Sequence, residues 1–165
     1  MDMFEKDTKM SDDDDKIKLL VTLLEESVGK LNAEPNCLLG RRGMEQASVA
    51  RIFYYMQNAL YTDPRFIEFR YLDLDGEYSK NGKEQKIING KSVRPDIILH
   101  RRLSNDENTM VVEFKVDGNG TDHDCRKLEN FTRLEGEYKY FIGVSVLLNQ
   151  QKPVYEYFRN GIKQA

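Results

Sequence analysis

Three charged residues lie in two segments of this sequence that are otherwise apolar. Asp96 follows Pro95 in the run RPDIILHRR, and Glu113 and Lys115 lie in the run NTMVVEFKV. Both runs are rich in Ile, Leu, Val and Phe and are bounded by turn-forming residues, which predicts β-strands. Charged side chains are rarely buried in such strands unless they are paired or bind a metal ion. The conflict between pattern and charge therefore indicates a functional site.

Two carboxylates on neighbouring strands can bind one divalent cation. If the two predicted strands are adjacent, Asp96 and Glu113 can reach a single Mg²⁺ at about 2.0–2.1 Å, with water completing its coordination. Strand side chains alternate between two faces, so Glu113 and Lys115 share one face, and Val112 and Phe114 take the other. The site would then lie on one face of a strand whose opposite face packs into a core.

The remaining patterns predict the elements that position these residues. Apolar residues recur at helical spacing over 17–31 and 44–60, and again after residue 122, where a helix is expected to about 134. Residues 66–78 alternate apolar and charged side chains and predict a strand, followed by a turn around Asn81-Gly82 and the two strands above. A loop over 117–122 precedes the third helix. Strands are expected over 138–148 and at VYEYF, the latter at a sheet edge.

The predicted order is α-α-β-β-β-α-β-β, which indicates an α/β protein with a central mixed β-sheet flanked by helices on both sides. The length of 165 residues predicts one domain over 15–165, after an acidic disordered tail over 1–14. The run DDDDK at 12–16 is compatible with a protease-cleavage linker and equally with a natural acidic tail. With no apolar membrane-length stretch and no secretory leader, a cytoplasmic location with reduced Cys37 and Cys125 is expected.

The net charge of −3 does not indicate a nucleic-acid-binding protein, because phosphate neutralisation requires clustered Lys and Arg. The first fifteen residues, however, hold seven acidic groups, so the rest of the chain is close to neutral. Local basic groups remain there, for example Arg41-Arg42 and Arg101-Arg102. Composition alone leaves the partner open.

The motif set and its order resemble the PD-(D/E)XK nuclease superfamily, also called restriction-endonuclease-like. The resemblance rests on Glu45 in a helix, on Pro95-Asp96 in one strand and on the run EFK at 113–115 in the next, followed by a helix and a strand. It covers roughly residues 44–148. The runs DGEYSKNG, RPDIILHRR and DCRKLENFT are similar to one bacterial branch of small, poorly characterised proteins in this superfamily.

This resemblance implies a restriction-endonuclease-like core and a Mg²⁺-dependent endonuclease or exonuclease that hydrolyses phosphodiester bonds, with DNA favoured and Mn²⁺ as a substitute. The implied metal ligands are Asp96, Glu113, Glu45 and the backbone carbonyl of Phe114. The implied catalytic residues are Asp96, Glu113, Glu45 and Lys115, which would hold the attacking water and stabilise developing negative charge. Because cutting both strands of a duplex requires two sites, a homodimer or larger assembly is a further expectation.

Five more residues are candidates for substrate binding or for support of the site: Gln46, Arg51, Tyr78, His100 and Lys127. Arg51 could contact a phosphate or pair with a carboxylate, and Lys127 could touch the substrate backbone. His100 shares a strand face with Asp96. Each also has an ordinary explanation, as a solvated helix residue, a packed tyrosine, a satisfied histidine or a surface lysine.

Ordinary structural roles also exist for the central residues. Glu113 and Lys115 could form a weak ion pair on an exposed edge, Asp96 could cap a turn, and Glu45 could favour a helix dipole. A further alternative is a structural protein in which the motif arises by chance. It requires the carboxylates of Asp96 and Glu113 to lie far apart in the fold. An alternative function is a catalytically silent nuclease-like fold that serves as a nucleic-acid- or protein-binding regulatory module.

Overall fold

A six-stranded mixed sheet forms the centre of the molecule, in the order β1-β6-β7-β8-β9-β10. The computed structural model describes residues 12–77, 80–81, 84–89, 91–116, 122–149 and 152–165. Strands β7 and β8 run parallel, and the other neighbouring strands run antiparallel. The strands are β1 (Asp73–Gly76), β6 (Ile97–His100), β7 (Met110–Val116), β8 (Ile142–Leu148), β9 (Val154–Arg159) and β10 (Ile162–Lys163).

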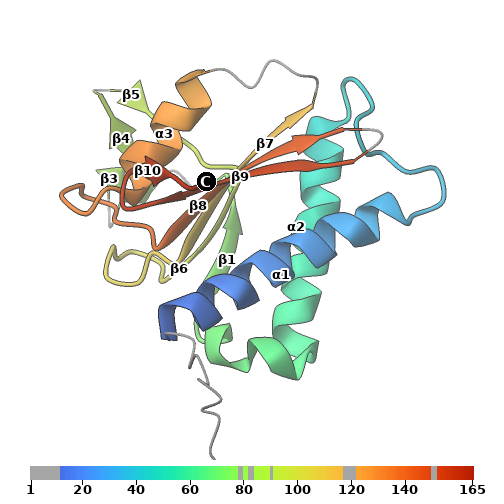
Figure 1. Cartoon of the computed structure of the whole chain (residues 1–165), viewed down its shortest axis with the longest axis horizontal. Helices are drawn as coiled ribbons and strands as arrows, with labels where there is room; N and C mark the ends of the chain where they lie inside the picture. Colours follow the sequence, from blue (N-terminus) through green and yellow to red (C-terminus); the bar gives the residue numbers. More distant parts are fainter. Residues whose placement is uncertain (1–11, 78–79, 82–83, 90, 117–121, 150–151) are drawn as a thin grey trace, which may run out of the picture.

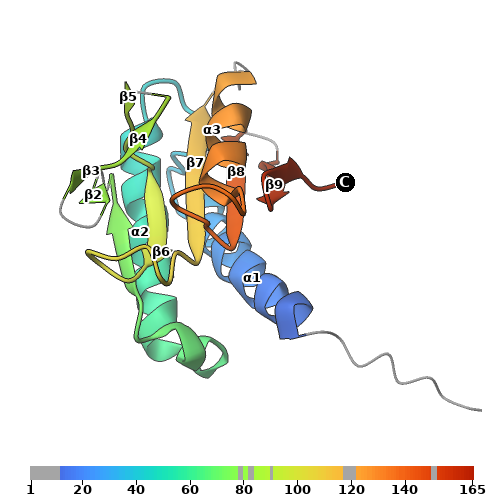
Figure 2. The same cartoon turned by 90° about the vertical axis from the view of Figure 1, so that its left-hand side faces the viewer.

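Helices cover both faces of the sheet, so the predicted α/β class and mixed sheet are confirmed (Figures 1 and 2). Helices α1 (Asp12–Asn32) and α2 (Glu45–Thr62) pack on one face, and α3 (Asp122–Thr132) packs on the other. The alternation of β7 follows from this arrangement. Val112 and Phe114 enter the core under α1 and α2, whereas Val111 enters the smaller core under α3.

The larger core joins the two N-terminal helices to the sheet, and its members include Leu20, Leu24, Ile52, Met56, Leu99, Val112, Phe114 and Val144. The smaller core contains Ile98, Val111, Leu128, Phe131 and Phe158. Gly143 on β8 allows α3 to approach closely, since a Cβ there would lie 3.1 Å from Thr132 Cγ2 and 3.4 Å from Leu128 Cδ2. This close approach brings the side chains of α3 onto β7.

Two predicted boundaries are wrong. Helix α1 begins at Asp12, so residues 12–14 are helical rather than part of a tail, and acidic residues in a first turn are favourable with the helix dipole. The segment 66–78 is not one strand, because Pro64–Phe69 forms the 3₁₀ helix η1 and β1 is confined to Asp73–Gly76. The side chain of Asp63 caps η1 by accepting a hydrogen bond from the Arg65 N–H (3.0 Å).

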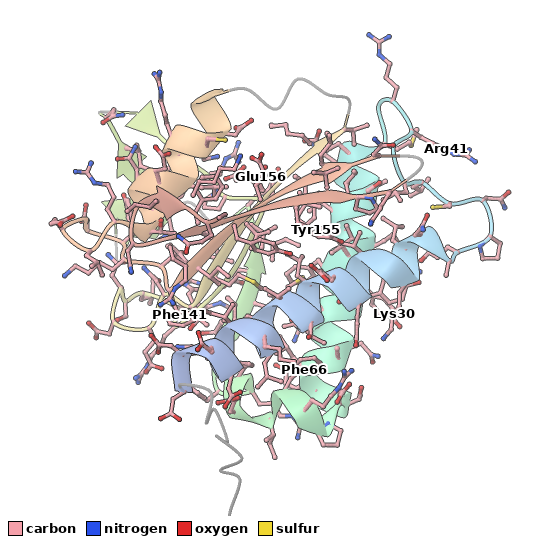
Figure 3. All side chains as sticks on the ribbon, viewed as in Figure 1. Lys30, Arg41, Phe66, Phe141, Tyr155 and Glu156 are labelled. Atoms are coloured by element: carbon pink, nitrogen blue, oxygen red, sulfur yellow. The ribbon has the colours of Figure 1, made fainter. Side chains whose placement is uncertain are left out.

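The spacing of buried residues explains η1. Phe66 and Phe69 lie three positions apart, which is one turn of a 3₁₀ helix, and both are buried. Phe66 lies close to α1 (Figure 3).

Several short strands are additional to the predicted order. Strand β2 (Lys80–Asn81) pairs with β3 (Glu84–Gln85) around the expected turn, whose residues 82–83 lie outside the described residues. A second small hairpin joins β4 (Ile87–Ile88) to β5 (Lys91–Ser92). Strand β9 is not an edge strand throughout, because β10 pairs with its C-terminal end. Most of the loop predicted over 117–122 lies outside the described residues.

Cys37 and Cys125 are both free thiols, as expected. Within the described part of the chain, every helix is too short or too polar to cross a membrane.

Candidate functional site

Strand β6 covers only the first part of β7. The two strands pair antiparallel from Ile97 opposite Val112 to Leu99 opposite Met110. Strand β7 continues to Val116, and β8 pairs with its whole length on the other side. Over residues 113–116, the edge of β7 that faces β6 therefore has no strand partner among the described residues, and the candidate site is built on this edge.

Asp96 and Glu113 lie opposite each other at the point where β6 begins. Extending the pairing of Ile97 with Val112 by one residue places Asp96 opposite Glu113. Opposite residues of an antiparallel pair point to the same face, with Cβ atoms about 4.5–5.5 Å apart. The two carboxylates therefore lie side by side where β6 begins, so the condition of the coincidental interpretation, that they lie far apart, is not met.

Two carboxylates bind the backbone of the uncovered edge. The Phe114 N–H donates a hydrogen bond to Asp96 Oδ2 (2.8 Å), and the Val116 N–H donates one to Glu45 Oε2 (3.3 Å). In a strand, the N–H and C=O of one residue point to the same neighbour, so the Phe114 carbonyl also points to this edge. The residue opposite Phe114 is Pro95, which has no N–H to offer it. The Phe114 carbonyl thus lies along the edge between the contacts of Asp96 and Glu45.

The start of α2 places Glu45 at this edge. Gly43 has a left-handed φ of +77°, which turns the chain into the helix, and Met44 provides no side-chain cap. Glu45 is the first helical residue, where a carboxylate is favoured by the helix dipole. Its side chain accepts the Val116 N–H of β7, so Glu45 lies at the same edge as Asp96.

Helix α3 adds two charges to the site. Lys127 Nζ lies 2.6 Å from Glu113 Oε1, and Asp124 Oδ2 lies 3.8 Å from Lys115 Nζ. Residues three apart lie on one helix face, so Asp124 and Lys127 both face β7. The side chain of Lys127 is only 15% exposed and is paired with Glu113. It is therefore not the surface lysine of the ordinary explanation, and the pairing also leaves little of it open to a substrate.

Asp124 is absent from the predicted set, although a signal for it exists in the sequence. The acid–base order of Glu113 and Lys115 on the strand is matched by Asp124 and Lys127 on the helix. Helical spacing of three and strand spacing of two both place such pairs on one face. The sequence could not show which acid faces which base, since this depends on how α3 crosses β7.

The two opposed carboxylates hold their protons more tightly than usual. Burial raises the pKa of Glu113 to about 7; the Lys127 ammonium opposes this rise, and the charge of Asp96 adds to it. Burial also raises the pKa of Asp96, against the Phe114 hydrogen bond and the charge of Lys127, while Glu45 adds to the rise. The site is thus short of positive charge despite the Lys127 contact.

The donor atoms fit Mg²⁺ in type but not as a complete cage. Among the described residues, no three Asp, Glu, His or Cys side chains gather closely enough to hold a metal by themselves. Asp96 Oδ2 accepts the Phe114 N–H and Glu113 Oε1 lies 2.6 Å from Lys127 Nζ, and each carboxylate has a second oxygen to offer an ion at the edge that carries the Phe114 carbonyl. Mg²⁺ is commonly held by one or two carboxylates together with water and substrate phosphate, so this set of oxygens suits it.

Two of the predicted supporting residues lie elsewhere. Arg51 donates hydrogen bonds to Glu34 (2.6 and 2.9 Å) on the outer side of α2. His100 Nε2 lies 2.8 Å from Asp75 Oδ2, and His100 is roughly 13 Å from Asp96 at about 3.3 Å per strand residue. Neither belongs to the site, because the partner of Arg51 is Glu34, beyond the end of α1, and the partner of His100 is Asp75 on β1.

The other two supporting candidates differ in outcome. Gln46 lines a cleft of about 540 Å³ to which Glu45 and Asp96 also contribute, so it adjoins the candidate site, and its role there stays a prediction. Tyr78 lies outside the described residues.

The buried state of Glu113 predicts a pH-dependent stability. Its pKa is raised in the folded protein, so folding favours the protonated form, and stability is lost as pH rises from about 4.5 to about 7. In metal-free buffer, the free energy of unfolding of the wild type should fall by up to about 3 kcal/mol between pH 5 and pH 8 because of Glu113, and Glu113→Gln should not show this fall. Urea unfolding at both pH values measures it.

The exposed Glu68 provides the matched control, because Glu68→Gln should leave the pH dependence of the wild type unchanged. Parallel pH profiles for the wild type and Glu113→Gln would contradict the burial of an ionisable Glu113.

Comparison with protein-family models and with curated proteins found no match for this chain. The fold and the site define an α/β protein whose mixed sheet carries a cluster of opposed charges where one strand leaves its neighbour.

Proposed function

We propose that this protein is a Mg²⁺-dependent nuclease with a restriction-endonuclease-like core, which hydrolyses phosphodiester bonds of nucleic acid. One observation carries the proposal: Asp96 and Glu113 lie opposite each other where β6 separates from β7. They lie beside the Phe114 carbonyl, which points to the edge of β7 that β6 does not cover. A purely structural role gives no reason to keep a buried and a half-buried carboxylate side by side, since like charges directly opposite each other are destabilising. DNA is favoured over RNA by the resemblance alone.

The residues divide into those that would hold the ion and those that act on substrate. Asp96, Glu113 and the Phe114 carbonyl would hold Mg²⁺, with Glu45 beside them. When bound, the ion supplies positive charge for the scissile phosphate and acidity for a water molecule. In hydrolysis the water oxygen bonds to phosphorus and one P–O ester bond breaks, which leaves a phosphomonoester and an alcohol.

Lys115 is the residue best placed to contact the water and phosphate. It shares the face of Glu113, and its side chain is 34% exposed, whereas Lys127 is largely covered. The 3.8 Å contact with Asp124 is a weak ion pair that orients the ammonium without enclosing it. Asp124 is therefore a positioning residue for Lys115. The ammonium would hold the attacking water and stabilise the charge that develops on phosphate.

Cleavage assays on Lys115 variants test this function. Single-stranded DNA, duplex DNA and RNA are incubated with the protein and Mg²⁺ or Mn²⁺. Lys115→Ala should lower the cleavage rate by about 10²–10³, the effect of removing one preorganised charge from a transition state. Lys18→Ala, at an exposed lysine of α1, is the control and should cleave as the wild type does. Equal rates for the wild type and Lys115→Ala would count against the proposal.

A second candidate function is a catalytically silent nuclease-like fold that binds nucleic acid or protein. The 2.6 Å contact between Lys127 and Glu113 favours it, because the ammonium supplies one positive charge where an ion would otherwise be needed. Titration with Mn²⁺ separates the two functions, since the silent module needs no metal at Asp96.

A further inference from the structure

The cleft beside the candidate site has an apolar part. Val49, Ala50 and Phe53 on one face of α2 line it, together with Gly76 at the end of β1. A Cβ on Gly76 would lie 3.6 Å from the Asp96 carbonyl oxygen and 3.9 Å from Phe53 Cδ2. The missing side chain thus leaves open the space between Asp96 and Phe53. An apolar wall of this kind suits a flat, uncharged group rather than a phosphate.

The described residues in the polar part of the cleft offer hydrogen-bond acceptors and one amide. Glu45, Glu77 and Asp96 contribute carboxylates, Gln46 contributes an amide, and no Lys or Arg is found among the described residues that line it. A phosphate without an accompanying cation would be repelled from this cleft. A neutral ligand with N–H donors would be attracted, because carboxylates accept such hydrogen bonds.

Glu77 is held in an unusual backbone conformation at the cleft. Its φ of +46° lies in the left-handed region, which a residue other than glycine rarely adopts. The Glu77 N–H donates a hydrogen bond to the Asp96 carbonyl (3.0 Å), which fixes Glu77 next to the candidate metal ligand. Such conformations cost free energy and cluster at ligand-binding sites.

We propose that this cleft receives an unpaired nucleobase that carries an exocyclic amino group, next to the phosphate at Asp96. The apolar face of the base would lie against Phe53 and Val49, and its amino group would donate to Glu77. The inference rests on the proposed nuclease function and specifies its substrate as single-stranded or locally unpaired nucleic acid. A base in a duplex is stacked and paired, and extruding it costs a few kcal/mol. Thymine is disfavoured because it has no amino group.

The test compares DNA binding by variants of two exposed alanines on α2. Ala50 lines the cleft and Ala47 does not. Fluorescence anisotropy measures the binding of labelled oligo(dA), oligo(dT) and their duplex, in EDTA and in Ca²⁺. The wild type should bind oligo(dA) about 10-fold more tightly than oligo(dT) or the duplex, the size of preference expected for one recognised base. Ala50→Trp should abolish this preference, and Ala47→Trp should retain it.

A third variant tests the hydrogen bond. Glu77→Gly removes the carboxylate and suits the left-handed backbone, so it should bind oligo(dA) and oligo(dT) equally. The proposal is overturned if the wild type binds the three DNAs equally, or if Ala50→Trp behaves like Ala47→Trp.

Failure of the cleft and failure of the nuclease function give different results. If Mn²⁺ binding and cleavage occur but Ala50→Trp leaves the base preference intact, only the cleft assignment is wrong. If the base preference depends on Ala50 and Glu77 but neither Mn²⁺ binding nor cleavage occurs, the cleft is a binding site and the nuclease function is wrong.

Discussion

Asp96→Asn should abolish divalent-metal binding and lower cleavage by at least about 10³-fold, while making the metal-free protein more stable. The loss follows from removing one of the two opposed carboxylates. The stability gain follows because the charge of Asp96 raises the pKa of the buried Glu113, so neutralising Asp96 relieves a repulsion. The asparagine amide oxygen can still accept the Phe114 N–H. Isothermal titration with Mn²⁺ and thermal unfolding in EDTA measure the two effects.

The direction of the stability change separates a functional Asp96 from a structural one. If Asp96 serves only to cap the backbone of β7, its replacement should lower the melting temperature and leave metal binding unchanged. Asp106→Asn, at an exposed loop aspartate, is the matched control and should change neither quantity. Unchanged Mn²⁺ affinity in Asp96→Asn would remove the basis for a metal site at this position.

Lys127→Met should destabilise the protein by about 3–5 kcal/mol at pH 8, the usual cost of leaving a buried charge without its partner. The loss should be smaller at pH 5. There Glu113, whose pKa burial raises to about 7, is protonated in the folded protein and needs no counter-charge. Urea unfolding at both pH values measures the difference.

Two further variants define what the loss means. Glu113→Gln combined with Lys127→Met should recover most of the stability, because no buried charge remains, and Lys18→Met should behave as the wild type. An equal loss at pH 5 and pH 8 would show that Lys127 acts through packing alone. If the Lys127 ammonium occupies the place that a metal ion would take beside Glu113, Mn²⁺ should stabilise Lys127→Met more than it stabilises the wild type. Equal stabilisation of the two proteins would favour the silent module.

Local periodicity predicted the parts of the fold that depend on neighbouring residues. Glu113 and Lys115 share a face because alternation is a property of any strand, and the burial of Glu113 followed from its apolar neighbours. Pro95 also carried readable information, since a proline cannot donate to the strand opposite. The segment after Pro64 misled because its alternation of apolar and charged residues suits a strand. The buried Phe66 and Phe69, three positions apart, instead suit a 3₁₀ turn, which Asp63 caps.

The contacts that the sequence could not predict join residues far apart in the chain. His100 shares a face with Asp96, yet its partner Asp75 comes from a strand that precedes it by 25 positions. The pairing of Lys127 with Glu113 depends on the angle at which α3 crosses the sheet, which Gly143 helps to set. The point at which β6 leaves β7 depends on their register, and composition does not specify a register.

The carboxylates at the uncovered part of β7 also protect the molecule against self-association. Unpaired N–H groups along a strand are a template for pairing with a strand of another molecule. Asp96 and Glu45 occupy the N–H groups of Phe114 and Val116, and their negative charges would repel an approaching copy of the same edge. Asp96 and Glu45 therefore also help to prevent strand pairing between molecules. Their loss would expose an edge of β7 that can pair with another copy.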